Sequence, residues 1–230
     1  MERIRLFYGF DPRESVGAHV FLQSILESSS LPVEAIALTP RLGKRLGISS
    51  DGSNSFSKLR FICPYLSDFK GYCIFLDGSD MLLRADLAEL WGKRDPYSAV
   101  QVVKHDYKTK SSRKYLGTEL EAENPDYPRK QWSSCILWNN SYWPHRRLTP
   151  EFISTEHGSY LHRFEWISED KIGELPKDWN HLVGEQELNP EAKVAHFTLG
   201  IPGFTLYKDC EHSEEWRETL DNSQRGLQCP

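Results

Sequence analysis

The sequence lacks any apolar run long enough to cross a bilayer, and it lacks an excess of basic residues. A membrane-spanning helix needs about 20 mostly apolar residues in succession, so we expect no transmembrane segment. The net charge at pH 7 is −5, whereas proteins that bind nucleic acids usually present a basic surface. Nucleic acid is therefore not an expected partner. Charged Glu2, Arg3 and Arg5 interrupt the amino-terminal segment, so no secretory signal is expected.

Cysteine is also scarce, because the chain has only five, with no C-x-x-C motif and no paired spacing. Cys63, Cys73 and Cys135 lie in apolar runs and are expected to be buried thiols, whereas Cys210 and Cys229 have polar neighbours. This pattern argues against a disulfide framework and favours a reducing compartment. We expect a cytoplasmic protein, with peripheral association to the inner face of the membrane as one option.

The chain contains no internal repeat, no low-complexity segment and no Pro/Gly-rich linker. We therefore predict that residues 1–230 form a single domain. Residues 4–8 and 33–38 are apolar strands, and Asp11 and Pro12 are suited to start the helix between them. A strand, a helix and a strand within about forty residues are typical of a parallel sheet. We predict an α/β fold with a central, mostly parallel sheet flanked by helices.

Hydrophobic periodicity predicts strands at residues 99–103, 132–140 and 193–197, and helices at 57–66, 87–91, 149–153 and from 211 onward. The helix at 57–66 should bury one apolar side and direct Lys58 and Arg60 away from it. Residues 42–54 are rich in Gly, Ser and basic residues, and we expect a mobile loop there. Residues 105–129 are polar and weakly periodic, which indicates a lid or an acceptor-binding loop.

Residues 72–83 are the stretch around which the chain is organised. Five mostly apolar residues run into Asp77-Gly78-Ser79-Asp80, which is typical of a buried strand that ends at a polar site. In an open α/β sheet, ligands bind in the crevice beyond the carboxyl ends of the strands. Two carboxylates in one small volume repel each other unless a cation relieves the repulsion. Such an oxygen-rich site suits Mg²⁺ or Mn²⁺.

The same four residues are also common in ordinary polar turns, so the motif alone leaves both interpretations open. An EF-hand loop is excluded, because its fifth position would be Met81, which offers no oxygen, and its sixth would be Leu82 rather than Gly. His196 lies beside an apolar run near the end of the chain. A lone His in that setting is more often a hydrogen-bonded core residue than a metal ligand, so its role depends on the wider pattern.

Taken together, these features resemble a GT-A-fold glycosyltransferase. The resemblance rests on the strand followed by Asp-x-x-Asp, on the Arg-bearing helix upstream and on the late segment 196–200, and it covers about residues 4–207. It is strongest toward the family 8-like group of bacterial lipopolysaccharide and capsule synthesis. It implies transfer of a sugar from a nucleotide-diphosphate sugar, such as a UDP-sugar, to a saccharide or other hydroxyl acceptor. Surface polysaccharide synthesis is the setting that it suggests.

The resemblance also implies a bound Mn²⁺ or Mg²⁺. The family has an Asp-x-Asp after the central strand, and Asp77 matches its first Asp. Ser79 stands where the second Asp is expected, and Asp80 lies one position further on. Because collagen-type glycosyltransferases use a similar Asp-x-x-Asp, the resemblance assigns Asp77, Asp80 and His196 as metal ligands. Such a cation would stabilise the charge on the departing diphosphate as a Lewis acid.

The remaining assignments concern the nucleotide sugar and the acceptor. The family's late Lys, which faces the diphosphate, is replaced by Gly203, so Lys208 or Arg60 is expected to supply that charge. Asp170 lies near the family's acidic acceptor motif and is the catalytic candidate, with a solvated structural carboxylate as the alternative. Tyr8 and Phe10 are expected to stack on the base. The resemblance assigns these nucleotide-sugar contacts: Tyr8, Gly9, Phe10, Asp11, Lys58, Arg60, Ser79, Gly200 and Lys208.

Two other functions remain open at this stage. A metal-dependent phosphatase or nucleotidyltransferase could use Asp77 and Asp80, but a haloacid-dehalogenase-type phosphatase needs an Asp at the position that Ser79 occupies. A non-catalytic carbohydrate-binding module with a degenerate site is the second alternative. The presence of Asp77, Asp80 and His196 argues against it.

Overall fold

The computed structural model describes residues 2–49 and 54–225. A six-stranded sheet in the order β2-β1-β3-β8-β5-β9 lies at its centre. Strands β1, β2 and β3 pair in parallel, as do β5 and β9, whereas β8 runs antiparallel to both β3 and β5. The predicted α/β fold with a mostly parallel central sheet is therefore confirmed. The strands are β1 (Ile4–Gly9), β2 (Val33–Leu38), β3 (Tyr72–Leu76), β5 (Val100–Val102), β8 (Cys135–Asn139) and β9 (Ile172–Glu174).

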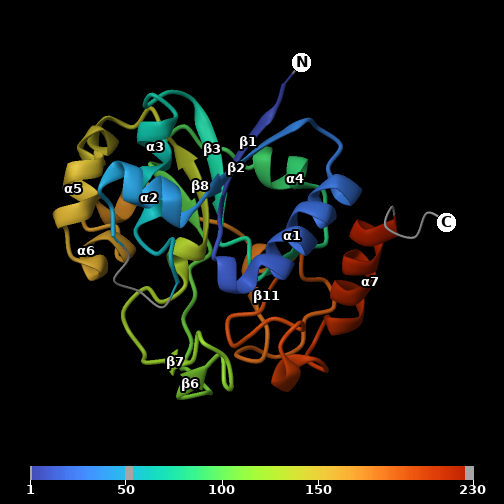
Figure 1. Ribbon diagram of the computed structural model, residues 1–230. Helices are drawn as coiled ribbons and strands as arrows, with labels where there is room; N and C mark the ends of the chain where they lie inside the picture. Colours follow the sequence, from blue (N-terminus) through green and yellow to red (C-terminus); the bar gives the residue numbers. More distant parts are fainter. Residues whose placement is uncertain (1, 50–53, 226–230) are drawn as a thin grey trace.

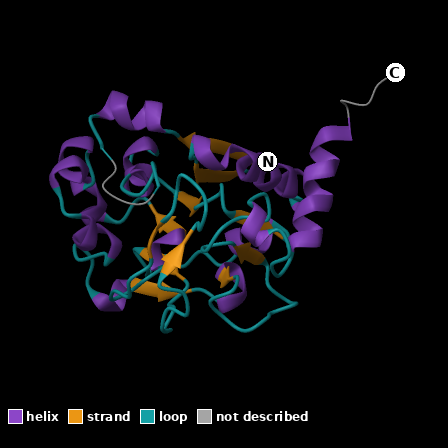
Figure 2. Ribbon diagram, turned by 60° about the horizontal axis from the view of Figure 1, so that its bottom comes forward, coloured by secondary structure: helices purple, strands orange, loops and turns teal. Residues whose placement is uncertain are grey.

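Helices cover both faces of this sheet (Figures 1 and 2). One side carries α2 (Pro40–Leu46), α3 (Cys63–Leu66), α5 (Pro150–Thr155) and α6 (Gly158–His162). The other side carries α1 (Ser15–Ser28), α4 (Leu87–Trp91) and α7 (Ser213–Gln224). Shorter 3-10 helices lie at Pro12–Glu14, Leu59–Ile62, Trp132–Ser134, Trp143–Arg147, Glu169–Lys171, Lys177–Asn180 and Thr205–Tyr207.

The two-sided burial explains the continuous apolar runs of the strands. In β1, Phe7 packs into the core on the α5 side, whereas Leu6 and Tyr8 pack into the core on the α1 side. In β3, Phe75 packs into the core on the α5 side and Ile74 packs into the core on the α1 side. Successive strand residues point to opposite faces, so a sheet covered on both faces needs apolar residues at every position.

Two smaller sheets lie beside the central one. The three-stranded sheet has the order β10-β11-β4, with β10 at His181–Leu182, β11 at Val194–His196 and β4 at Met81–Leu83. A two-stranded hairpin joins β6 (Arg113–Lys114) and β7 (Ala122–Glu123), and it lies at the bottom of Figure 1. Within the part of the chain that the structure describes, no helix is both long and apolar enough to cross a membrane.

The prediction of a mobile loop at residues 42–54 was wrong for its first part. Helix α2 includes residues up to Leu46, because Thr39 caps its first turn through the amide of Leu42 and Pro40 occupies the first helical position. Gly47 then ends the helix in the left-handed conformation (φ +70°). Residues 50–53 of the predicted loop lie outside the described residues.

The predicted helix at residues 57–66 is also different in the structure. A 3-10 helix at Leu59–Ile62 leads into the short helix α3, and the Lys58 and Arg60 side chains are buried. The prediction that three cysteines are buried thiols is confirmed. Cys63, Cys73 and Cys135 are buried free thiols. Cys229 lies outside the described residues.

Candidate active site

Three side chains from distant parts of the sequence meet at the carboxyl end of β3. Asp77 follows β3 directly, and Asp80 precedes β4. Strand β11 pairs with β4 so that His196 lies opposite Met81, and the amide of Phe197 donates to the Asp80 carbonyl at 2.8 Å. One donor atom from each of Asp77, Asp80 and His196 falls within 4.8 Å of the others. Antiparallel pairing of β4 and β11 thus brings together the three residues that the sequence singled out.

The turn between the two carboxylates requires glycine. Gly78 has a φ of +75°, and a Cβ at this position would lie 2.9 Å from the carbonyl oxygen of Gly9. Ser79 fixes the same turn, because its hydroxyl donates to the Gly9 carbonyl at 3.1 Å and accepts from the Asp11 amide at 3.2 Å. The Ser79 side chain therefore joins the loop after β1 to the loop after β3, and it is fully buried.

The carboxylates and the imidazole form a site suited to a hard divalent cation. Nε2 of His196 lies 3.3 Å from Oδ2 of Asp80 and 3.8 Å from Oδ2 of Asp77. The second oxygen of Asp80, Oδ1, is buried and has no hydrogen-bond partner among residues 2–49 and 54–225. A buried carboxylate oxygen without a partner is costly, and a bound cation would satisfy it. The residues present therefore fit Mn²⁺ or Mg²⁺.

Positive side chains balance this acidic cluster. An ion pair joins Nη1 of Arg60 to Oδ1 of Asp77 at 2.7 Å, and the same nitrogen donates to the Ser133 carbonyl at 2.8 Å. The guanidinium also lies over the rings of Phe56 and Phe75. Helical spacing alone did not predict that Arg60 would be buried. Its side chain enters the protein because Asp77 and the aromatic rings provide a partner for the charge.

The two carboxyl groups differ in acidity. Burial raises the pKa of Asp77 to about 6, although Arg60 acts in the opposite direction. Burial also opposes ionisation of Asp80, but the charge and hydrogen bond of His196 outweigh it and leave the pKa of Asp80 below its usual range. As the pH falls, Asp77 therefore gains a proton before Asp80 does. A cation would compete with the proton of Asp77 for this place.

The cluster forms part of the wall of a cavity of about 660 Å³. Arg60 and Ser133 line it beside the carboxylates, and His162 of α6 lines it further out. Nδ1 of His162 lies 2.7 Å from the hydroxyl of Ser133, and burial lowers the pKa of His162 to about 3, so its ring is neutral. A volume of this size is in the range of small-molecule sites.

The polar segment at residues 105–129 supplies another wall of the cavity. Lys114, the last residue of β6, and Tyr115, which follows it, both line the cavity. The Tyr115 hydroxyl donates to Oδ2 of Asp80 at 3.4 Å, and its amide donates to the carbonyl of Leu199 at 2.6 Å. Burial lowers the pKa of Lys114, whereas the charges of Asp80 and Asp77 act to raise it. The sequence showed only a weakly periodic excursion here, so neither Lys114 nor Tyr115 was predicted.

Two further side chains near the cluster were missed. Asn180 accepts a hydrogen bond from Nδ1 of His196 at 2.8 Å. Glu14, at the end of the 3-10 helix Pro12–Glu14, is buried. Burial, together with the charges of Asp80 and Asp11, raises the pKa of Glu14 well above its usual range. Both residues lie in segments without a motif, so the sequence held no signal for their proximity to Asp80.

The predicted nucleotide-binding turn is largely occupied by internal contacts. Tyr8 is buried in the core, where its ring packs against Phe21 at a centroid distance of 5.8 Å. The structure therefore does not present Tyr8 for stacking on a base. The Asp11 carboxylate accepts hydrogen bonds from Arg13 and from the amide of Ser55. Gly9 approaches the ring of Phe56 so closely that a Cβ would lie 2.3 Å from it, and Phe10 is half-buried.

The other predicted residues lie at varied distances from the cluster. Lys58 donates from Nζ to the carbonyl of Glu156 at 2.8 Å. A Cβ at Gly200 would lie 2.5 Å from the ring of Tyr207, so this glycine permits close packing. The side chain of Lys208 is 67% exposed and lies 3.9 Å from Asp209. Of the two residues expected to supply charge to a diphosphate, Arg60 lines the cavity, whereas Lys208 is not among its described lining residues.

Asp170 does not join the site. Its side chain is 71% exposed in the 3-10 helix at Glu169–Lys171 and lies 3.6 Å from Lys171. A hydrogen bond from Ser168 lowers its pKa, as for an ordinary solvated carboxylate. Asp170 is absent from the described residues that line the cavity. The structure therefore favours the solvated structural carboxylate over the catalytic assignment.

The sheet order, the Asp-x-x-Asp turn after β3 and the His-bearing strand β11 define a GT-A fold. Solved structures of glycosyltransferases share this fold over nearly the whole length of the chain. WbbM, a bifunctional glycosyltransferase, matches 96% of this chain with a TM-score of 0.68 and 14% identity. GlyE of Streptococcus pneumoniae matches 99% with a TM-score of 0.61 and 14% identity. The galactosyltransferase LgtC matches 97% of this chain and 99% of its own length, with a TM-score of 0.59 and 12% identity.

The chain spans 50% of the WbbM chain and 63% of the GlyE chain. No family model matches the sequence. A curated protein gives the family instead: the chain is 36% identical over 227 residues to Protein CDI of Arabidopsis thaliana, which covers 94% of this chain and 86% of that protein. The chain therefore belongs to the family of Protein CDI.

Proposed function

We propose that this protein is a metal-dependent glycosyltransferase that moves a sugar from a nucleotide-diphosphate sugar, such as a UDP-sugar, to a hydroxyl acceptor. The observation that carries the proposal is the meeting of Asp77, Asp80 and His196 on the wall of a 660 Å³ cavity at the end of β3. Ligands of open α/β sheets bind at this edge. The GT-A fold that the chain shares with WbbM, GlyE and LgtC supports the same reaction class.

The charges around the cavity suit a diphosphate leaving group. A divalent cation held by Asp77, Asp80 and His196 would supply Lewis-acid stabilisation of the developing negative charge. Arg60 and Lys114 both line the cavity and add positive charge to its wall. Lys114 thus takes the place of the late Lys that this sequence lacks. Preorganised charges of this kind are effective because they need no rearrangement during the reaction.

Tyr115 and residues 122–125 form one wall of the cavity, and the Tyr115 hydroxyl donates to Asp80. This wall would position the acceptor hydroxyl and limit the access of water. A saccharide fits such a mixed polar and aromatic wall. LgtC was crystallised with donor and acceptor sugar analogues, which supports a two-substrate site in this fold. We propose a glycan acceptor, with surface polysaccharide as the acceptor class that the resemblance implies.

We further propose that the reaction takes place in the cytoplasm. The four cysteines within the described ranges are all free, which suits a reducing compartment. Catalysis would then use the cytoplasmic pool of nucleotide sugars.

A donor screen tests the proposed function. A panel of nucleotide sugars would be incubated with the protein, with and without Mn²⁺, and release of nucleoside diphosphate would be measured. We expect release with one donor class, dependent on Mn²⁺ and increased by the acceptor. The Asp80→Asn variant should lose this activity, whereas Asp170→Asn, outside the cavity, should retain it.

Binding and catalysis are separated by a second measurement on the same samples. A donor that binds the native state raises its apparent stability in proportion to the logarithm of ligand concentration. Stabilisation by a nucleotide sugar without any turnover would support the non-catalytic carbohydrate-binding alternative. No stabilisation and no turnover across the panel would refute the proposed function.

A further inference from the structure

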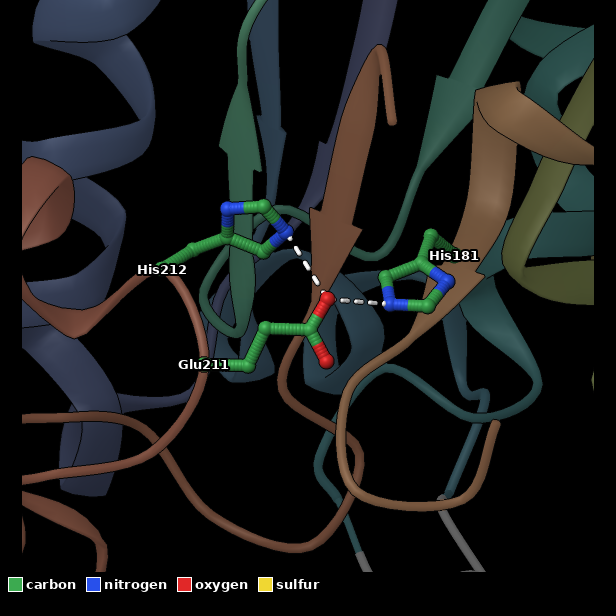
Figure 3. Close-up of side chains that lie close together, drawn as sticks. All are labelled: His181, Glu211 and His212. Carbon is green, nitrogen blue, oxygen red and sulfur yellow. Dashed lines mark hydrogen bonds and ion pairs between the residues drawn. The ribbon is translucent and has the colours of Figure 1, made fainter. Parts of the chain in front are cut away.

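A second group of metal-ligating side chains lies apart from the cavity, where α7 begins. It consists of His181 in β10 and of Glu211 and His212, the two residues that precede α7 (Figure 3). Nε2 of His181 lies 2.7 Å from Oε1 of Glu211, and Nε2 of His212 lies 3.0 Å from the same oxygen. The two rings approach this oxygen from opposite sides, as Figure 3 shows. One donor atom from each residue falls within 4.8 Å of the other two.

The backbone holds these side chains in place. His212 has a φ of +59°, a conformation that is uncommon for a non-glycine residue and that turns its ring toward Glu211. The amide of Asn189 donates to Oε1 of Glu211 at 3.2 Å, which fixes the carboxylate. Glu215 also faces His212, with its Oε2 3.7 Å from Nδ1, and the same oxygen pairs with Nε of Arg84 at 2.7 Å.

Hydrogen bonding accounts for only part of this arrangement. Oε1 of Glu211 already accepts from His181 and Asn189, and His212 is directed at the same atom. Nε2 of His212 is buried and makes no hydrogen bond of acceptable geometry with the residues that the structure describes. The His212 side chain is only 7% exposed, so water does not readily replace the missing partner. Nε2 of His212, which makes no hydrogen bond within the described ranges, thus points at the Glu211 carboxylate, and His181 contacts the same carboxylate.

We propose that His181, Glu211 and His212 bind a divalent transition metal, with Zn²⁺ as the best fit. Two imidazoles and one carboxylate are a ligand set that Zn²⁺ accepts, with a water in the fourth position. Tetrahedral Zn²⁺ with bonds of about 2.0–2.1 Å separates its ligand atoms by about 3.3 Å. The nitrogen-to-oxygen distances of 2.7 and 3.0 Å need to increase only slightly to reach this spacing.

The position of this site gives the metal a structural role. His181 belongs to β10, which pairs with β11, whereas Glu211 and His212 precede α7. A metal at this point would tie the start of α7 to the small sheet. It would also hold the residue that follows Asn180, and Asn180 contacts His196 of the first cluster. The site is built from different residues, so the proposal does not depend on glycosyl transfer.

The experiment uses the full chain with Zn²⁺ alone as the probe. The Asp80→Asn variant serves as the background, because it removes a ligand of the first cluster. After removal of metal with a chelator, Zn²⁺ would be titrated, and the bound stoichiometry and affinity would be measured by native mass spectrometry and calorimetry. We expect one tightly bound Zn²⁺ per chain in this background. Adding His212→Gln should weaken that binding about 100-fold or more, since even the loss of a group that only hydrogen-bonds to a metal ligand costs about 10–100-fold.

Control variants keep the test decisive. His19→Gln removes an exposed imidazole of α1 outside both clusters and should leave the Zn²⁺ affinity unchanged. If His212→Gln does not fold, as judged by circular dichroism, His181→Gln tests the same site from β10. Absence of tight Zn²⁺ binding in the Asp80→Asn background would overturn the proposal. Equal affinities in the His19→Gln and His212→Gln variants would overturn it too.

Discussion

Asn180 fixes which nitrogen of His196 faces the carboxylates. The amide group of Asn180 donates to Ser134 Oγ at 2.8 Å, so its oxygen is the acceptor that meets Nδ1 of His196 at 2.8 Å. In a neutral ring, Nδ1 then carries the proton and Nε2 directs its lone pair at Asp80. A lone pair facing a carboxylate is favourable only with a cation or a proton between them. The hydrogen bond to Asn180 therefore holds His196 in the orientation that a metal ligand at this position would need.

From this relationship we predict that Asn180→Ala weakens Mn²⁺ binding about 10–100-fold, the usual cost of losing a group that orients a metal-binding His. Calorimetric titration of the metal-free protein would measure the loss. Asn180→Asp is the matched variant, because it keeps an oxygen that can accept from Nδ1 of His196. It should retain more affinity than Asn180→Ala. Equal Mn²⁺ affinities for the wild type and Asn180→Ala would show that Asn180 does not orient the ring.

A second prediction separates Ser79 from Asp80. Asp80→Asn should abolish metal-dependent turnover, because hard cations favour charged oxygen ligands. Ser79→Ala should leave Mn²⁺ affinity within a few-fold, since the Ser79 hydroxyl contacts Gly9 and Asp11 instead. It should reduce the free energy of unfolding by about 1–3 kcal/mol, because it leaves buried backbone groups without partners. Metal titration and denaturant unfolding of both variants would measure these effects, and a Ser79→Ala variant with normal stability and lost metal binding would contradict the assignment.

A third prediction concerns Arg60, which is buried and paired with Asp77. Arg60→Ala should destabilise the fold by about 3–5 kcal/mol, the usual cost of leaving a buried charge such as Asp77 without its partner. Arg60→Ala, Asp77→Asn and the double variant form a thermodynamic cycle, in which the double variant should be more stable than the sum of the two losses predicts. Denaturant unfolding would measure all three. Additive losses would show that the ion pair contributes no coupling.

A fourth prediction follows from His145, which is fully buried. Its Nε2 donates to the carbonyl of Ala99 at 3.1 Å, and Nδ1 accepts from Trp166 at 3.2 Å. Burial lowers the pKa of His145 from 6.5 to about 4, so the folded protein holds the neutral ring. Below pH 6.5 the unfolded chain binds a proton that the folded protein does not bind until about pH 4. Stability should therefore fall as the pH decreases through this interval, by about 3 kcal/mol from this group.

Unfolding of the wild type and of His145→Gln at several pH values would measure this contribution. Gln cannot gain a proton in this range, so the difference in stability between the two proteins should shrink as the pH falls from 6.5 to 4. Parallel stability curves would show that His145 titrates alike in the folded and unfolded states.

The sequence by itself determined the central elements and the position of the acidic turn. The apolar runs of β1, β3 and β8 required a sheet buried on both faces, because strands alternate their side chains between the two sides. Asp77 and Asp80 had to follow β3, since the polar cluster interrupts the apolar run there. Local chemistry also specified the caps, as with Asp86 at the start of α4.

Only the tertiary structure decided which side chains surround those carboxylates. His196 reaches Asp80 across 116 positions through the pairing of β4 and β11, and Lys114 and Tyr115 reach the cavity from a segment without clear periodicity. The burial of Arg60 could not be inferred from helical spacing, because the nearby Asp77 charge overrides the preference of a guanidinium for water. Periodicity reports which face of an element is apolar, whereas contacts between distant segments depend on how the elements pack.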